Sequence, residues 1–189
     1  AVPTGALNAL HFIRRGKIRS GEKVLINGAA GNIGCYAVQL AKSNGAEVTA
    51  VDSAGKLDML RSIGADHVID YMQVDSTKNG ETYDVILDAV GKSPFPRSLK
   101  SLNKNGRYVL ANPRLLQMVR GLWVSMTTSK NVIFEFAGYR TEDLVFLKEL
   151  IEAGTIRSVI DRTYPLEQTA DAHRYVDTGQ KAGNVIITL

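Results

Sequence analysis

The sequence lacks the features that mark membrane-spanning, disulfide-stabilised and nucleic-acid-binding proteins. Its 189 residues include one cysteine, Cys35, which excludes an internal disulfide and a cysteine-rich zinc site and favours a reducing compartment. No apolar run approaches the roughly 20 residues of a membrane helix. The basic residues are scattered, and only Arg14 and Arg15 are adjacent, so no basic stripe could follow a nucleic-acid backbone. We therefore expect a cytoplasmic protein with neither a membrane nor nucleic acid as partner.

The composition, 44% hydrophobic and 22% charged, is that of an ordinary globular domain. No internal repeat or low-complexity linker interrupts the chain. Because the sequence begins Ala-Val-Pro-Thr-Gly rather than with methionine, we interpret it as the continuation of a larger protein.

Strand and helix patterns alternate along most of the chain, which predicts a parallel sheet with helices on its faces. The expected strands span residues 23–27, 47–51, 67–70, 83–90, 107–111, 132–137, 159–164 and 185–189. Helices are expected after the glycines at 28–34, after Ser53, within 113–129, from Thr141 and over 166–178, with Ser53 and Thr141 as N-caps. Leu144, Leu147, Leu150 and Ile151 should face inward. The predicted fold class is α/β, a doubly wound parallel sheet of the Rossmann type, and the strand at 132–137 is expected at its edge.

A glycine-rich segment, Gly28-Ala-Ala-Gly-Asn-Ile-Gly34, lies between the first predicted strand and the helix after it. In that context glycines allow a tight turn, close approach of the backbone to a pyrophosphate, and close packing of helix on strand. Gly31 and Gly34 should be the hardest to replace. The amides of Asn32, Ile33 and Gly34 would then donate to phosphate oxygens at the positive end of the helix dipole.

Asp52 ends the second predicted strand, 21 positions after Gly31, about where an acid binds the adenosine ribose hydroxyls. Together the two features predict a binding site for NAD or NADP. Alternatively, the glycines form only a structural turn, and Asp52 faces solvent or caps the next helix beside Ser53.

These segments resemble the medium-chain dehydrogenase/reductase superfamily, and within it the zinc-independent quinone oxidoreductase-like branch. The resemblance spans nearly the whole chain and includes the segments 38–42, 64–71, 83–91 and 159–166. It implies further cofactor contacts from Ser53, Lys56 and Tyr71 on the adenosine side, from Ala89, Val90, Gly91 and Ala111 on the nicotinamide side, and from Asn184 near the pyrophosphate. It implies no metal site, because residues 1–5 contain neither the Cys nor the Glu that zinc-dependent relatives use.

Members of this superfamily are about twice as long, because an N-terminal barrel supplies the substrate pocket and most catalytic groups. The resemblance therefore implies a cofactor-binding domain at 1–157 and a return segment at 158–189 that belongs with the missing barrel. No catalytic residue is expected here, and the isolated chain should be inactive. The parent protein would transfer hydride between NAD(P)H and a quinone, enone or other small carbonyl compound, or act as an alcohol dehydrogenase, and would pair as a homodimer. The alternative is a module that binds or senses the nucleotide without catalysis.

Other candidate residues have simpler interpretations. Cys35, at a helix start, could be a stabilised thiolate or a small packed residue. His11, His67 and His173 lack metal-ligand spacing, and Asp84 and Asp88 are not expected to act as a dyad. The apolar residues 115–123 could line a substrate pocket, although packing is the simpler interpretation.

The sequence contains opposing signals on the choice between NAD and NADP. Asp52 favours NAD, because a carboxylate would repel a 2′-phosphate. Lys56 favours NADP, because NADP-using relatives carry a lysine at this position. We expect an exposed Lys56 to compensate only in part, so that NAD binds at least as well.

Overall fold

The computed structural model describes residues 2–138 and 140–189. Its helices are η1 (Val2–Ala6), α1 (Leu7–Arg15), α2 (Asn32–Ser43), η2 (Ala54–Lys56), α3 (Leu57–Ser62), α4 (Phe95–Lys100), α5 (Leu115–Thr127), α6 (Thr141–Glu152), η3 (Leu166–Gln168) and α7 (Thr169–Asp177). Its strands are β1 (Lys23–Asn27), β2 (Glu47–Asp52), β3 (His67–Asp70), β4 (Tyr83–Asp88), β5 (Leu102–Leu110), β6 (Asn131–Phe134), β7 (Ile160–Pro165) and β8 (Asn184–Thr188).

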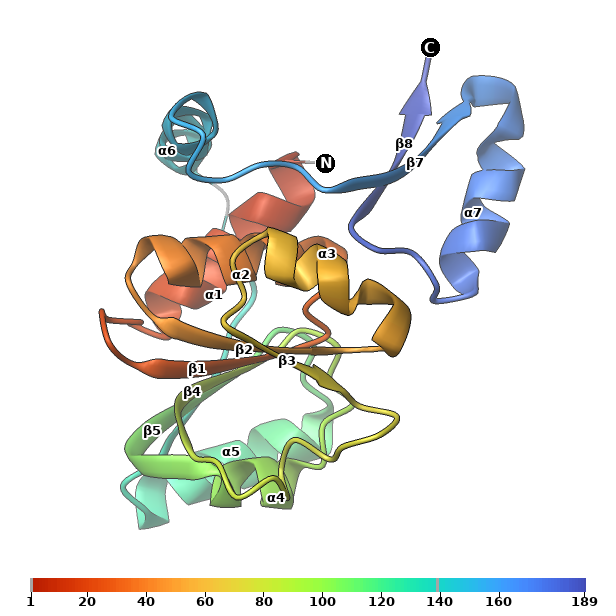
Figure 1. Ribbon diagram of the computed structural model, residues 1–189. Coiled ribbons are helices and arrows are strands. Elements are labelled where there is room, and N and C mark those ends of the chain that lie inside the picture. The colour runs from red at the N-terminus through yellow and green to blue at the C-terminus, as the bar shows by residue number, and fades with distance from the viewer. Residues whose placement is uncertain (1, 139) are drawn as a thin grey trace.

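The first six strands form one parallel sheet in the order β3-β2-β1-β4-β5-β6. Helices α1, α2 and α3 cover one face of this sheet, and α4 and α5 cover the other (Figure 1). The strand order reverses between β1 and β4, and ligands bind at this switch point of open α/β sheets. The predicted doubly wound Rossmann-type fold is confirmed, and β6 is an edge strand as expected.

Two hydrophobic clusters, one on each face of the sheet, stabilise the fold. The larger cluster packs α1 and α2 on β1 and β2, and includes the fully buried Tyr36 and Leu147. The smaller one is centred on Tyr108 and Phe95. Because β1 is buried on both faces, its residues Val24, Leu25 and Ile26 form a continuous apolar run.

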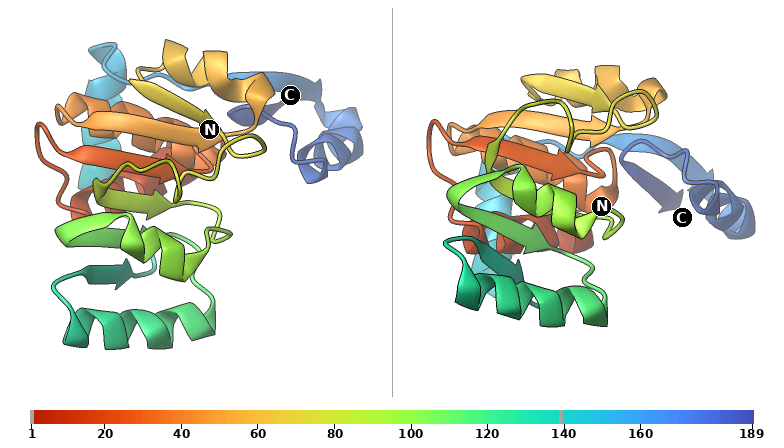
Figure 2. Two further views of the ribbon diagram at one scale, coloured as in Figure 1. Left: turned by 60° about the horizontal axis from the view of Figure 1, so that its bottom comes forward. Right: turned by 90° about the horizontal axis from the view of Figure 1, so that it is seen from below.

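The last part of the chain forms a separate unit of β7, α7 and β8, which we call the C-terminal unit (residues 158–189). Its two strands pair with each other in parallel and do not join the main sheet. The unit lies beside the carboxyl ends of the main strands (Figure 2), and the Gly183 amide donates to the Ala30 carbonyl at 2.8 Å. No helix in the described part of the chain is both long and apolar enough to span a bilayer.

Several local expectations were wrong. Ser53 stands at the N-cap position of η2 as expected, but its side chain makes no capping bond, and Thr141 is the first residue of its helix rather than the cap. The Ser53 amide instead donates to the Asp52 carboxylate at 2.9 Å. Leu144 is 40% exposed rather than inward, because α6 faces the core with the side that carries Leu147, Leu150 and Ile151. β4 stops at Asp88, two residues early, because the chain turns there around that carboxylate.

Candidate functional site

The glycine-rich turn joins β1 to α2 in the conformation that the sequence predicts. Gly28 has a φ of +75°, and a Cβ there would lie 2.1 Å from a Val90 methyl carbon. A Cβ on Gly34 would lie 2.3 Å from the Gly28 carbonyl oxygen and 2.6 Å from Ala29. These two positions therefore require glycine for the fold itself.

Gly31 differs from the other two glycines. Its φ of −77° is accessible to any residue, and a Cβ would meet only the Gly28 carbonyl oxygen, at 3.2 Å. The Gly28 carbonyl would have to shift by only a few tenths of an ångström, so the fold requires glycine less strongly here than at Gly28 and Gly34. A ligand that approaches the backbone closely would explain glycine at this position.

Within the described residues, several backbone donors at the start of α2 have no acceptor. Inside the helix, the Cys35 amide is the first to bond back along the chain, to Gly31 at 3.0 Å. The amides of Asn32, Ile33 and Gly34 precede it, in the first turn, where a helix has no internal acceptors. Free amides and the helix dipole both favour negative charge at a helix N-terminus, so this position has the chemistry to receive an anion such as a pyrophosphate.

Asp52 lies at one side of this turn, and its side chain is only 9% exposed. One carboxylate oxygen accepts from the Ala30 amide at 2.9 Å, and the other accepts from Ser53 and pairs with Lys56 at 3.2 Å. Asp52 thus holds the glycine turn itself, a role the sequence analysis did not assign. Tyr71, 56% exposed, follows β3 at the same corner, and its amide donates to the Asp52 carbonyl.

Lys56 is not the flexible surface lysine that we expected. Its side chain is 14% exposed, and Nζ also donates to the Gly179 carbonyl of the C-terminal unit at 2.9 Å. A second lysine at this corner, Lys181, was not identified from the sequence. Burial lowers the pKa of Lys181, the charge of Lys56 lowers it further, and the charge of Asp52 opposes this shift. Only its position two residues before Gly183 could have indicated it.

The nicotinamide-side residues lie in the loops that follow β4 and β5. Asn112 donates to the Ala89 carbonyl at 2.8 Å, and a Cβ on Gly91 would lie 2.4 Å from the Asn112 carbonyl oxygen. Val90 is 43% exposed, and its side chain packs against Gly28. The amide of Ala111 bonds the Asp88 carbonyl. The structure thus brings three loops together at the switch point of the sheet.

Asn184 is buried at the start of β8, next to the residue that contacts the turn. Its side-chain nitrogen donates to the Val159 carbonyl at 3.0 Å, so it fixes the C-terminal unit. It reaches the glycine turn only through its neighbour Gly183, which bonds Ala30.

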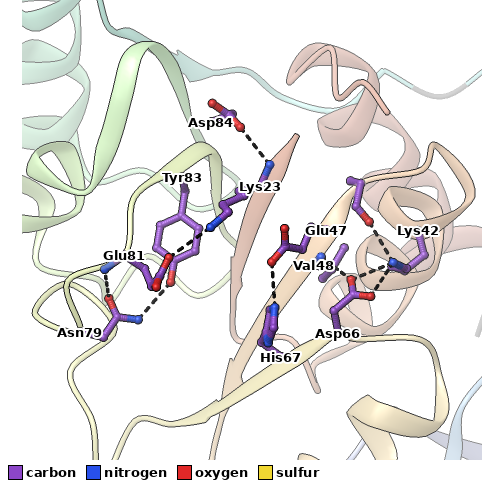
Figure 3. A network of polar contacts seen from close by, with 11 residues as sticks. Lys23, Lys42, Glu47, Val48, Asp66, His67, Asn79, Glu81, Tyr83 and Asp84 are labelled. Atoms are coloured by element: carbon purple, nitrogen blue, oxygen red, sulfur yellow. Dashed lines mark hydrogen bonds and ion pairs between the residues drawn. The ribbon is translucent and has the colours of Figure 1, made fainter. Parts of the chain in front are cut away.

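A second polar cluster lies at the opposite end of the strands, where β1, β2, β3 and β4 begin (Figure 3). It borders a cavity of about 330 Å³ lined by Lys23, Glu47, Thr49, His67, Ile69, Asn79, Glu81 and Tyr83. Its charged groups pair with one another: His67 with Glu47 at 2.8 Å, and Lys23 with Glu81 at 3.3 Å. These pairs join β2 to β3, and β1 to the segment just before β4, so we assign them a structural role.

The described residues do not fit a zinc site. Within residues 2–138 and 140–189, no three His, Cys, Asp or Glu side chains lie together as metal ligands. Cys35 is fully buried, and burial raises the pKa of its thiol to about 11, which disfavours the thiolate a metal needs. Of the two interpretations of Cys35, packing fits this environment.

Comparisons with known proteins agree with this architecture. A family described as zinc-binding dehydrogenase matches residues 63–187. A mitochondrial NAD(P)H oxidoreductase of Bos taurus is 34% identical over 90% of this chain and 48% of its own length. A chloroplastic quinone oxidoreductase of Triphysaria versicolor is 29% identical over 88% of this chain and 52% of its own. The structure of a quinone oxidoreductase from Coxiella burnetii, 26% identical, superimposes with a TM-score of 0.88 over 99% of this chain and 59% of that one. The chain thus spans about half the length of the curated relatives it matches.

Proposed function

Since this chain belongs to the zinc-binding dehydrogenase family, as a quinone oxidoreductase-like member of the medium-chain dehydrogenase/reductase superfamily, we propose that it is the half that binds NAD(P)H in an oxidoreductase. The observation that carries the proposal is Gly31. Its backbone does not require glycine, yet it stands directly before three unpaired helix amides. A pyrophosphate lying against this backbone accounts for both features.

Each part of the site has a role in holding such a cofactor. The first turn of α2 would bind the pyrophosphate, and the corner of Asp52, Lys56 and Tyr71 would receive the adenosine end. The loops 89–91 and 111–112 would position the nicotinamide, which supplies the hydride chemistry when bound. These residues bind and orient, and we assign no catalytic residue among them.

The whole protein, in this proposal, reduces a quinone, enone or other small carbonyl compound. The names of the relatives support this class of substrate, and the substrate pocket would belong to the half that this chain does not include. The C-terminal unit would join that half, because a two-stranded sheet is marginal by itself. The 189 residues alone should therefore show no appreciable turnover.

The structure changes the argument on NAD and NADP. Lys56 already pairs with Asp52, so a 2′-phosphate would meet a neutral pair, with Lys181 close by, rather than an unpaired carboxylate. The sequence argument for NAD assumed that Lys56 was exposed, and it is not. We therefore propose that NADH and NADPH bind with affinities within about tenfold of each other, or about 1.4 kcal/mol.

We also propose that the parent protein is a homodimer. β6 has one unpaired edge, and α5 beside it exposes an apolar stripe that has no cover within the described residues. The stripe consists of Leu115, Leu116, Val119, Leu122, Trp123 and Met126.

The test is a calorimetric titration of the chain and of Gly31→Ala with NADH and NADPH. Because Gly31 has an ordinary φ, the variant should unfold within about 1 kcal/mol of the original chain but bind both cofactors at least tenfold more weakly. Equal affinity in a folded Gly31→Ala would contradict the assignment. Turnover of a quinone by the chain alone would contradict the proposal that the substrate pocket lies in the half that this chain does not include. Binding by the full-length protein without turnover on any carbonyl would favour a sensing module.

A further inference from the structure

Asp88 ends β4 at the switch point of the sheet, and no solvent reaches it. One carboxylate oxygen accepts from Asn27 Nδ2 at 3.0 Å and from the amides of Val90 and Gly91 at 3.2 and 2.9 Å. The other accepts from the Ser93 amide and the Tyr108 hydroxyl, both at 3.2 Å. The five donors come from β1, β5 and the loop after β4, so one side chain ties these three segments together.

The donors indicate that Asp88 is ionised. Backbone amides can only donate, so they cannot accept a hydrogen bond from a protonated acid. The Tyr108 hydroxyl keeps its proton, because burial and then the charge of Asp88 raise the pKa of that hydroxyl. In the described parts of the chain no lysine, arginine or histidine pairs with Asp88. It is therefore a buried negative charge stabilised by dipoles alone, and its field is not cancelled by a cation.

We propose that Asp88 is a positioning residue that fixes the loop 89–93 against the nicotinamide and makes this end of the groove bind the oxidised, positively charged ring more favourably than the reduced, neutral ring. This inference rests on the proposed function. Within this loop, the Val90 side chain packs against Gly28 of the glycine turn. The carboxylate lies directly beneath this loop, so its charge acts on whatever the loop contacts.

The experiment compares dissociation constants for NAD⁺ and NADH, measured by calorimetry on the 189-residue chain, in the original and in Asp88→Asn. Loss of the charge should weaken the oxidised form about fivefold more than the reduced form. Asp84→Asn is the matched control, because it removes the same charge from the other end of the same strand, where Asp84 accepts from the Lys23 amide and the Asn103 side chain. In Asp84→Asn, the ratio of the NAD⁺ and NADH dissociation constants should be the same as in the original chain.

Tyr108→Phe separates the charge from the scaffold and remains informative if Asp88→Asn does not fold. It removes one donor but keeps the carboxylate, so the preference for the oxidised form should stay the same or increase. A ratio that falls in Tyr108→Phe, or that is unchanged in folded Asp88→Asn, would overturn the role of Asp88 while leaving the proposed function intact. Failure of the original chain to bind either form would overturn both.

Discussion

Helices α2 and α5 cover opposite faces of the same sheet, yet their surroundings differ. In α2, all eight residues from Gly34 to Ala41 are buried, because β1 lies on one side and α1 on the other. In the longer α5 only Gly121 is buried, although most of its residues are apolar. A helix that is apolar all round is normally covered on every side. The difference indicates that α2 is complete within this chain, whereas α5 lacks a partner.

Each helix makes one close contact through a glycine, α2 with the glycine turn through Gly34 and α5 with β6 through Gly121, and these two glycines allow a direct comparison. Gly34→Ala places a Cβ 2.3 Å from a backbone oxygen, which cannot move without displacing the whole turn. We expect a loss of about 3 kcal/mol or more in the free energy of unfolding, measured by urea denaturation.

Gly121→Ala on α5 is the matched control. The added Cβ would lie 2.7 Å from a Val132 methyl carbon, and a side chain can adjust. The higher helix propensity of alanine offsets part of the strain, so the loss should be about 1 kcal/mol. An equal or larger loss for Gly121→Ala would contradict the view that α2 is the more tightly constrained helix.

The α2 side also contains an ion pair with a pH dependence. Lys42 bonds Asp66 at 2.7 Å, and the Val48 amide donates to the same carboxylate. Burial alone would raise the pKa of Asp66, but these two hydrogen bonds and the charges of Lys42 and His67 together outweigh it and lower the pKa. A lowered folded-state pKa stabilises the protein above the unfolded-state pKa, and this stabilisation disappears as the pH falls through the folded value.

Asp66→Asn should therefore reduce stability by about 1 kcal/mol near pH 7, after allowing for solvent screening, and by much less near pH 3. Denaturation at the two pH values measures the difference. A loss that stays constant with pH would show that the carboxylate charge is not the cause.

The smallest effect on stability is expected on the exposed face of α5. Trp123, the only tryptophan of the chain, is 68% exposed there. Trp123→Ser should change the free energy of unfolding by no more than about 0.5 kcal/mol. If this stripe is the dimer surface, the same variant should weaken self-association at least tenfold, as measured by light scattering over a concentration series.

Leu166→Ser controls for the loss of any exposed apolar side chain, because Leu166 is 54% exposed on the C-terminal unit. It should leave association unchanged. Equal effects of the two variants, or a chain that stays monomeric at high concentration, would contradict the assignment of the α5 stripe as the dimer surface.

The sequence by itself determined the fold class and the position of the glycine turn before α2. Both depend on local patterns: an apolar strand, three glycines at fixed spacing, and a helix that ends before Gly45, whose φ is +79°. Each of these features is set by steric limits within a few residues, so its meaning does not depend on the rest of the chain. The same patterns placed Asp52 at the correct strand end.

Only the tertiary structure decided what the charged groups at this site do. Lys56 is held in part by the Gly179 carbonyl, 123 positions away, and Asp88 by donors from β1 and β5. Lys181 lies near Asp52 and Lys56 only because the C-terminal unit docks on Ala30. The energy of a buried charge depends on all the dipoles and charges around it, and these come from segments far apart in the chain. Sequence spacing contains no information about which of them will meet.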